Sequence, residues 1–187
     1  GVVKVREAIL AKQEQRFGAE SKEVGVALSN LGVAYAASGD NAKKLDAFER
    51  ALSIYEREHG SDSAEVAGAL NCLGNAYSGL GDYAKKRDLL ERALAIEERA
   101  YGRDHVEVSI TLGNLGTAYG NLGDHAKKRD VLERALAIEE RAYGKDHALY
   151  FACTNGQYDA ARLLLDKGAE VDRANQNDWT PLQSACC

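Results

Sequence analysis

The chain has little that would interrupt a helix and no stretch long enough to cross a membrane. Only one of its 187 residues is proline and none is methionine. Proline removes a backbone donor and breaks helices, so its scarcity favours long uninterrupted ones. No apolar run approaches the roughly 20 residues of a membrane span. We therefore expect a helical protein that does not insert into membranes.

Cysteine is also scarce, and its four copies form neither a Cys-x-x-Cys pair nor a set at zinc-ligand spacing. We expect free thiols in a reducing, cytoplasmic compartment. The formal net charge of −5 argues against nucleic-acid binding, which needs a basic stripe.

Nothing in the sequence predicts an enzyme. The histidines lie in loops or alternate with tyrosine at equivalent repeat positions, as His59 does with Tyr101 and Tyr143. The carboxylates are expected on solvated helix faces or at helix caps. No glycine-rich phosphate loop occurs. We therefore predict no catalytic residue, no metal and no cofactor.

What is present is a repeat. Three similar five-residue stretches stand 42 residues apart, at 31–35, 73–77 and 115–119, and the residues between them recur with the same period. A period of this size indicates an array in which each repeat buries its apolar face against its neighbours.

Each repeat is predicted to form two helices. We expect a lone second helix over Val2–Phe17, and three complete repeats from 19 to 146. In each of these, a first helix ends at a Gly-Asp pair, whose aspartate caps the second helix. Asp62 and Asp104, followed three residues later by glutamate, suit capping boxes that open the first helices of the second and third repeats.

The order Leu-Gly-x-Ala-Tyr, Gly-Asp, Glu-Arg-Ala-Leu resembles the tetratricopeptide (TPR) repeat, and the 42-residue period resembles the longer variety found in kinesin light chains. The resemblance covers residues 1 to about 146 and implies close helix packing at glycines such as Gly74. It also suggests that Tyr77 fills the gap to the following repeat. Lys44, Lys86 and Lys128 stand where the family usually packs a small residue on that glycine. Either their ammonium groups reach water past buried stems, or the second helix is displaced.

After residue 146 the period changes to 33. Leu149, Ala152 and Cys153 recur as Leu182, Ala185 and Cys186, with Trp179-Thr180-Pro181-Leu182 before the second set. This resembles an ankyrin array, with one repeat and the start of a second over 147–187. We expect Leu149, Ala152 and Leu163–Leu165 to pack on the last TPR helices, near Leu132, Leu136 and Tyr143. The short loop 144–147 leaves no room for a hinge.

The first helix of each repeat carries no charged residue over 24–38, 66–80 and 108–122. In TPR arrays this helix lines the concave side, so the resemblance implies a groove that binds an extended peptide. It lacks the lysines and arginines with which chaperone-adaptor TPRs hold a terminal carboxylate. The implied peptide-contacting positions are Asn30, Val33, Asn71, Asn75, Ser78, Asn114, Thr117 and Asn121.

The sequence thus predicts an all-α, right-handed helical-repeat solenoid that continues into a partial ankyrin array and binds a protein or peptide. The alternative is a structural spacer of a larger protein, because 84–102 and 126–144 differ only at Leu89 and Val131. The chain opens and stops inside repeats, so we expect a fragment of a longer protein that self-associates through its truncated ends.

Overall fold

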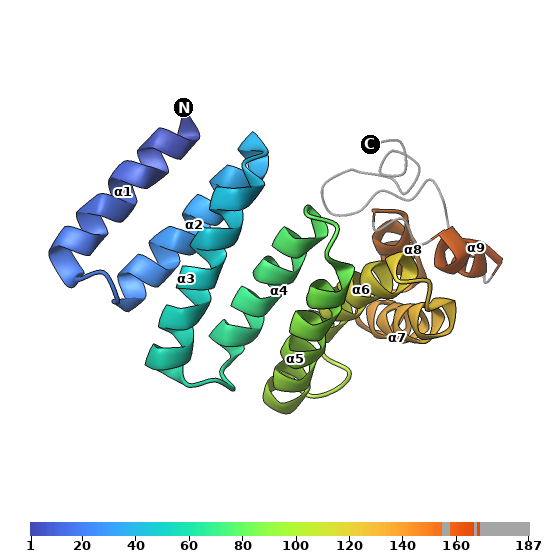
Figure 1. Ribbon diagram of the computed structural model, residues 1–187. Coiled ribbons are helices and arrows are strands. Elements are labelled where there is room, and N and C mark those ends of the chain that lie inside the picture. The colour runs from blue at the N-terminus through green and yellow to red at the C-terminus, as the bar shows by residue number, and fades with distance from the viewer. Residues whose placement is uncertain (155–157, 167, 169–187) are drawn as a thin grey trace. The chain divides into compact units, whose positions relative to one another are not determined.

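The computed structural model describes residues 1–154, 158–166 and 168, and every regular element in them is an α-helix. The fold is the expected all-α helical-repeat solenoid (Figure 1). The helices are α1 (Val2–Phe17), α2 (Lys22–Ser38), α3 (Asn41–His59), α4 (Ala64–Ser78), α5 (Tyr83–Tyr101), α6 (Val106–Asn121), α7 (His125–Tyr143), α8 (Lys145–Thr154) and α9 (Tyr158–Asp166).

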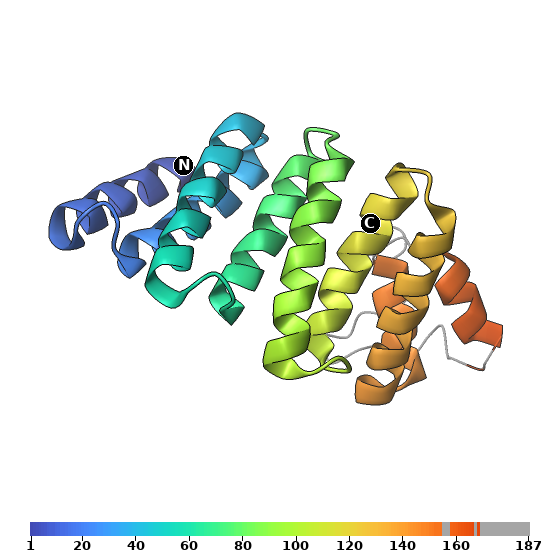
Figure 2. The ribbon, with the colours of Figure 1, turned by 60° about the horizontal axis from the view of Figure 1, so that its bottom comes forward.

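The chain divides into an N-terminal unit, Gly1–Ala100, and a C-terminal unit, Tyr101–Cys187. In the N-terminal unit α1 packs on α2, α2 on α3 and α3 on α4 (Figure 2). Apolar residues of α4 and α5 share a core cluster. In the C-terminal unit α6 packs on α7, while α7, α8 and α9 all contact one another.

Local chemistry sets the ends of the helices as predicted. Gly39 follows α2 with a left-handed φ of 76°, which glycine adopts without steric cost. The side chain of Asp40 then accepts a hydrogen bond from the backbone N–H of Lys43, at 3.1 Å, and so caps α3. Asp82 and Asp124 cap α5 and α7 in the same way.

The predicted capping boxes are wrong by one residue. Ser63, not Asp62, caps α4 by accepting from the N–H of Val66, and His105 caps α6 by accepting from the N–H of Glu107 through Nδ1. The aspartates instead pair with arginines near the ends of the second helices. Arg99 contacts Asp62 at 3.0 Å, and Arg141 contacts Asp104 at 2.7 Å.

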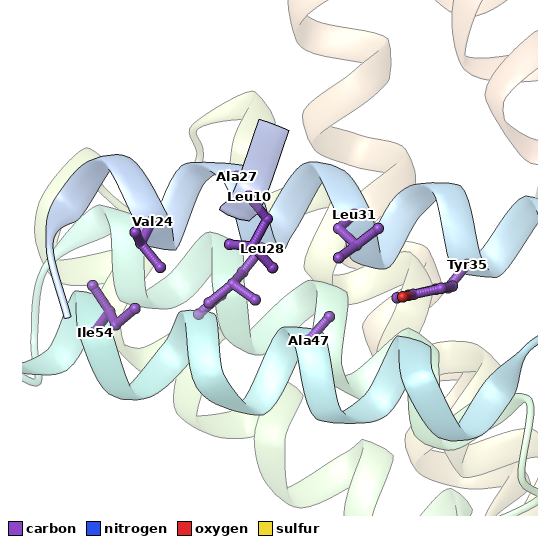
Figure 3. Close-up of a cluster of buried hydrophobic side chains, with 9 residues drawn as sticks. Leu10, Val24, Ala27, Leu28, Leu31, Tyr35, Ala47 and Ile54 are labelled. Carbon is purple, nitrogen blue, oxygen red and sulfur yellow. The ribbon is translucent and has the colours of Figure 1, made fainter. Parts of the chain in front are cut away.

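The core of the first repeat is a cluster of aliphatic side chains between α1, α2 and α3 (Figure 3). Leu28 and Leu31 of α2 meet Leu10 of α1 and Ala47 of α3 in this cluster. The alanine at position 47 has a small side chain, so it fills little of the space between the helices.

The glycine in the middle of each first helix allows the closest helix approach. A Cβ atom on Gly32 would lie 2.6 Å from Cε1 of Phe48, and one on Gly116 would lie 2.4 Å from Cδ2 of Leu132. The residue packed on the glycine is therefore Phe48 or Leu132, one helical turn beyond the position where the lysine was expected to meet it.

The three lysines differ in burial. Lys128 is half-exposed, whereas Lys44 and Lys86 are buried and their ammonium groups bond nearby oxygens. Nζ of Lys44 donates to Oδ1 of Asn41 at 2.8 Å, and Nζ of Lys86 lies 3.4 Å from Oγ of Ser78. Burial lowers the pKa of Lys86, because a dry site disfavours the charged form.

The recurring tyrosine of the first helix joins its repeat to the preceding one, not to the following one as expected. The hydroxyl of Tyr35 donates to Oε1 of Glu7 on α1 at 2.7 Å, and Tyr77 donates to Oε1 of Glu49 on α3 at 2.9 Å. The bond to Glu7 is the main cause that raises the pKa of Tyr35 to about 12. Tyr35 therefore stays a hydrogen-bond donor at neutral pH.

The predicted packing after α7 is largely confirmed. Leu149 and Ala152 of α8 and Leu164 of α9 share a buried cluster with Leu136 of α7. Leu165 is 41% exposed and does not belong to it. Only Gly144 separates α7 from α8, so the connection is shorter than the loop that was expected. The repeat-like residues Trp179 to Cys186, and the side chain of Leu163, lie outside the described residues.

Candidate protein-binding surface

Beyond the glutamate of its first turn, the first helix of each TPR-like repeat exposes one narrow, uncharged face. On α2 this face carries Val26, Asn30 and Val33, with Val26 46% and Val33 60% exposed. The spacing of four and three residues brings these side chains onto the same side of the helix. Large apolar side chains exposed to water on a helix whose other face is buried are candidates for contact with a partner.

The equivalent faces of α4 and α6 are more polar. Asn75 is exposed on α4, while Ile110, Thr117 and Asn121 are exposed on α6 and Asn114 is half-buried there. Nδ2 of Asn121 donates to the backbone carbonyl of Thr117 at 2.9 Å, and the amide oxygen of Asn121 takes no part in that bond. The uncharged stretches predicted from the sequence thus include an accessible face in both units.

Two of the predicted positions turn toward the second helix. Nδ2 of Asn71 donates to Oε1 of Glu97 on α5 at 2.9 Å, and Ser78 lies beside Lys86. Both residues are only half-exposed. The amide of Asn71 therefore holds a partner within its own repeat.

Two carboxylates are buried, so the prediction that all acids lie on solvated faces or at caps is wrong. Glu97 is 6% exposed and Glu139 is 2% exposed. Glu139 accepts a hydrogen bond from Oγ of Ser109, and its other oxygen lies 3.4 Å from Nδ1 of His147. The equivalent residue of the first repeat is Tyr55, and that aromatic side chain was the available signal that this position faces inward.

No metal centre is formed by the part of the chain that the structure describes, where no three His, Cys, Asp or Glu side chains gather. Among the same residues, no helix is both long and apolar enough to span a bilayer. Cys72 and Cys153 are free thiols, and burial raises the pKa of each.

These features define a helical-repeat protein with accessible faces on its first helices. The tetratricopeptide repeat model matches residues 23–85 and 65–140, and the chain belongs to that family. The ankyrin repeat model, for three copies, matches residues 125–187. The two matches overlap on α7, the helix on which α8 and α9 pack.

Solved structures share the fold. BtubC (BKLC) from P. vanneervenii is 28% identical, with a TM-score of 0.70 over 76% of this chain, and the chain spans 57% of the length of BtubC. A Podosopora anserina protein described as a putative kinesin light chain, with nearly identical TPR-like repeats, is 21% identical. A crystal structure of a single-substitution variant of that protein has a TM-score of 0.73 over 88% of this chain and 82% of its own. No curated protein sequence matches the chain.

Repeats of the TPR and ankyrin families generally act as protein-interaction scaffolds and are typically non-catalytic.

Proposed function

We propose that this protein is a non-catalytic scaffold that binds an extended peptide or partner segment on the uncharged faces of α2, α4 and α6. The observation that carries the proposal is the exposure of Val26, Val33 and Ile110 beside asparagines on helices whose opposite faces are buried. Apolar side chains of a partner would cover the valines and the isoleucine. The amides of Asn30, Asn75 and Asn114 would bond its backbone, as the resemblance to TPR grooves implies. The two free thiols support a reducing, cytoplasmic location.

The test is to select binding peptides from a random library with the intact protein and then measure the affinity of one for variants. Asn30→Ala combined with Asn75→Ala should weaken binding about fivefold per lost amide bond, since such a bond contributes on the order of 1 kcal/mol. Affinity should change little between low and physiological salt, because the faces carry no charge. Asn71 is left unchanged in this design, since its amide holds the buried Glu97.

The matched control is Ser53→Ala, an exposed position on α3 where the next repeat already has alanine. It should bind the peptide as the parent protein does. Equal affinity for the double variant and the control would contradict the proposal, as would binding that collapses with added salt. Selection that yields no peptide at all would favour the spacer function.

We infer a second function, self-association, from the outer face of α1. Val2 and Val5 are 68% and 61% exposed, and Ile9 lies on the same side of the helix. The equivalent positions on α3, Lys44, Ala47 and Ala51, are all buried against neighbouring helices. An aliphatic stripe of this kind is favourably covered by a second copy. Residues 169–187, at the other end where self-association was also expected, lie outside the described residues.

Light scattering over a concentration series tests this function. The average mass should rise with concentration, and Val5→Glu combined with Ile9→Lys should keep the protein monomeric, because each change places a charge in the stripe. A strict monomer at high concentration, or association unaffected by the two changes, would contradict the inference. Val26→Ser on α2 is the control for a general loss of exposed apolar surface.

A further inference from the structure

The N-terminal unit contains a cavity of about 270 Å³ between the second helices α1 and α3, over the core side of α2. Its floor is apolar and consists of Leu10, Leu28, Leu31 and Ala47 (Figure 3). This surface is distinct from the exposed faces of the first helices proposed above for peptides. A cavity of about 150 Å³ with aliphatic walls is already large enough to hold benzene.

The repeat itself explains why the cavity exists. With the exception of Ala11, the other lining residues recur unchanged 42 residues later, whereas Ala47 is replaced there by Leu89. Leu89 packs on the clusters that contain Leu70, Leu73 and Tyr77, the counterparts of Leu28, Leu31 and Tyr35. A leucine side chain therefore occupies in the second repeat the space that alanine leaves open in the first. The third repeat also has a larger residue, Val131, at this position.

The rim of the cavity is charged and its balance is negative. Three carboxylates, those of Glu7, Glu14 and Asp46, and two cationic groups, those of Lys43 and Arg50, line it. Arg50 pairs with Glu14 at 2.9 Å, and Lys43 lies 3.5 Å from Asp40, outside the cavity. Nζ of Lys43 also lies 5.4 Å from the centre of the Tyr35 ring, so it stays at the cavity and the five groups of the rim carry a net charge of −1. Of the three carboxylates, those of Glu7 and Asp46 are the two outside the Glu14 ion pair.

Tyr35 closes the wall between floor and rim. Its hydroxyl donates to Oε1 of Glu7 and so holds that carboxylate at the cavity. An apolar floor under a rim with a net negative charge suits a molecule with a hydrocarbon group and one positive charge.

We propose that this cavity is a binding site for a small organic cation, whose apolar group fills the space beside Ala47 and whose ammonium group faces Glu7 and Asp46. The apolar group of the cation would fill the space that the side chain of Leu89 fills in the second repeat. Burial of that volume and contact with the carboxylates both favour binding.

Phenethylammonium is a suitable probe, titrated into the intact protein while amide chemical shifts and heat are recorded. One equivalent should bind, with shifts concentrated on residues around Ala47. Ala47→Leu, which copies the second repeat, should weaken binding at least tenfold. Ala47→Val, which copies the third repeat, serves the same purpose if the leucine variant does not fold. Asp46→Asn should weaken binding of the cation severalfold and leave binding of the neutral analogue 2-phenylethanol unchanged.

The reciprocal variant is Leu89→Ala, which should open the equivalent space in the second repeat and raise the stoichiometry from one to two. Failure of the probe to shift residues of the cavity at its solubility limit would overturn the proposal. Unchanged affinity in both Ala47 variants, or tighter binding of 3-phenylpropionate than of the cation, would also overturn it.

Discussion

Replacing Leu149 by alanine should destabilise the C-terminal unit by about 2–5 kcal/mol, the usual cost of removing a fully buried leucine side chain. Leu149 is 1% exposed and shares its cluster with Leu136 of α7 and Leu164 of α9. The loss of stability should therefore affect both α7, in the TPR-like part, and α8 and α9, in the ankyrin-like part. Urea unfolding followed by circular dichroism measures the change in the free energy of unfolding.

Amide hydrogen exchange shows which helices lose stability in the variant. In Leu149→Ala, amides of α7 near Leu136 should exchange faster together with those of α8 and α9, because the three helices share one cluster. The control, Leu165→Ala, removes a side chain on α9 that is outside the cluster, and should stay within about 0.5 kcal/mol of the parent protein. Faster exchange confined to α8 and α9, with α7 unchanged, would show that the ankyrin-like segment is an independent domain.

Gly32→Ala should destabilise the N-terminal unit by up to about 2 kcal/mol, because overpacking of a core costs about 1–3 kcal/mol and the better helix propensity of alanine offsets about 1 kcal/mol of that. The new methyl group would lie 2.6–2.9 Å from three ring atoms of Phe48, which is itself buried and has little room to move. Thermal and urea unfolding both report the difference.

Gly68→Ala is the matched control, and its sign should be opposite. Gly68 lies in the middle of α4, is exposed, and has no atom within 4 Å of an added Cβ. The same substitution there should stabilise the protein by about 0.5–1 kcal/mol, because alanine loses less backbone freedom in a helix. Two variants that shift stability in the same direction would contradict the packing role assigned to Gly32.

The helices and their order could be predicted from the sequence because their determinants are local. A glycine that leaves the helix with positive φ and an aspartate that caps the next one act within a few residues, so Gly39-Asp40 identifies the junction of α2 and α3 without knowledge of the rest. The 42-residue period strengthens that signal, since each kind of boundary occurs three times. The change of period after residue 146 likewise marked the start of the ankyrin-like pattern.

What only the tertiary structure decided is how each second helix is rotated between its neighbours. Glu97 and Glu98 are adjacent and chemically identical, and only the structure shows that Glu97 is buried against Asn71. The same holds for the cavity beside Ala47, whose sequence signal is one small residue in an otherwise repeated set. Burial depends on contacts from helices distant in sequence, and a periodic pattern shows which positions are equivalent but not what surrounds them.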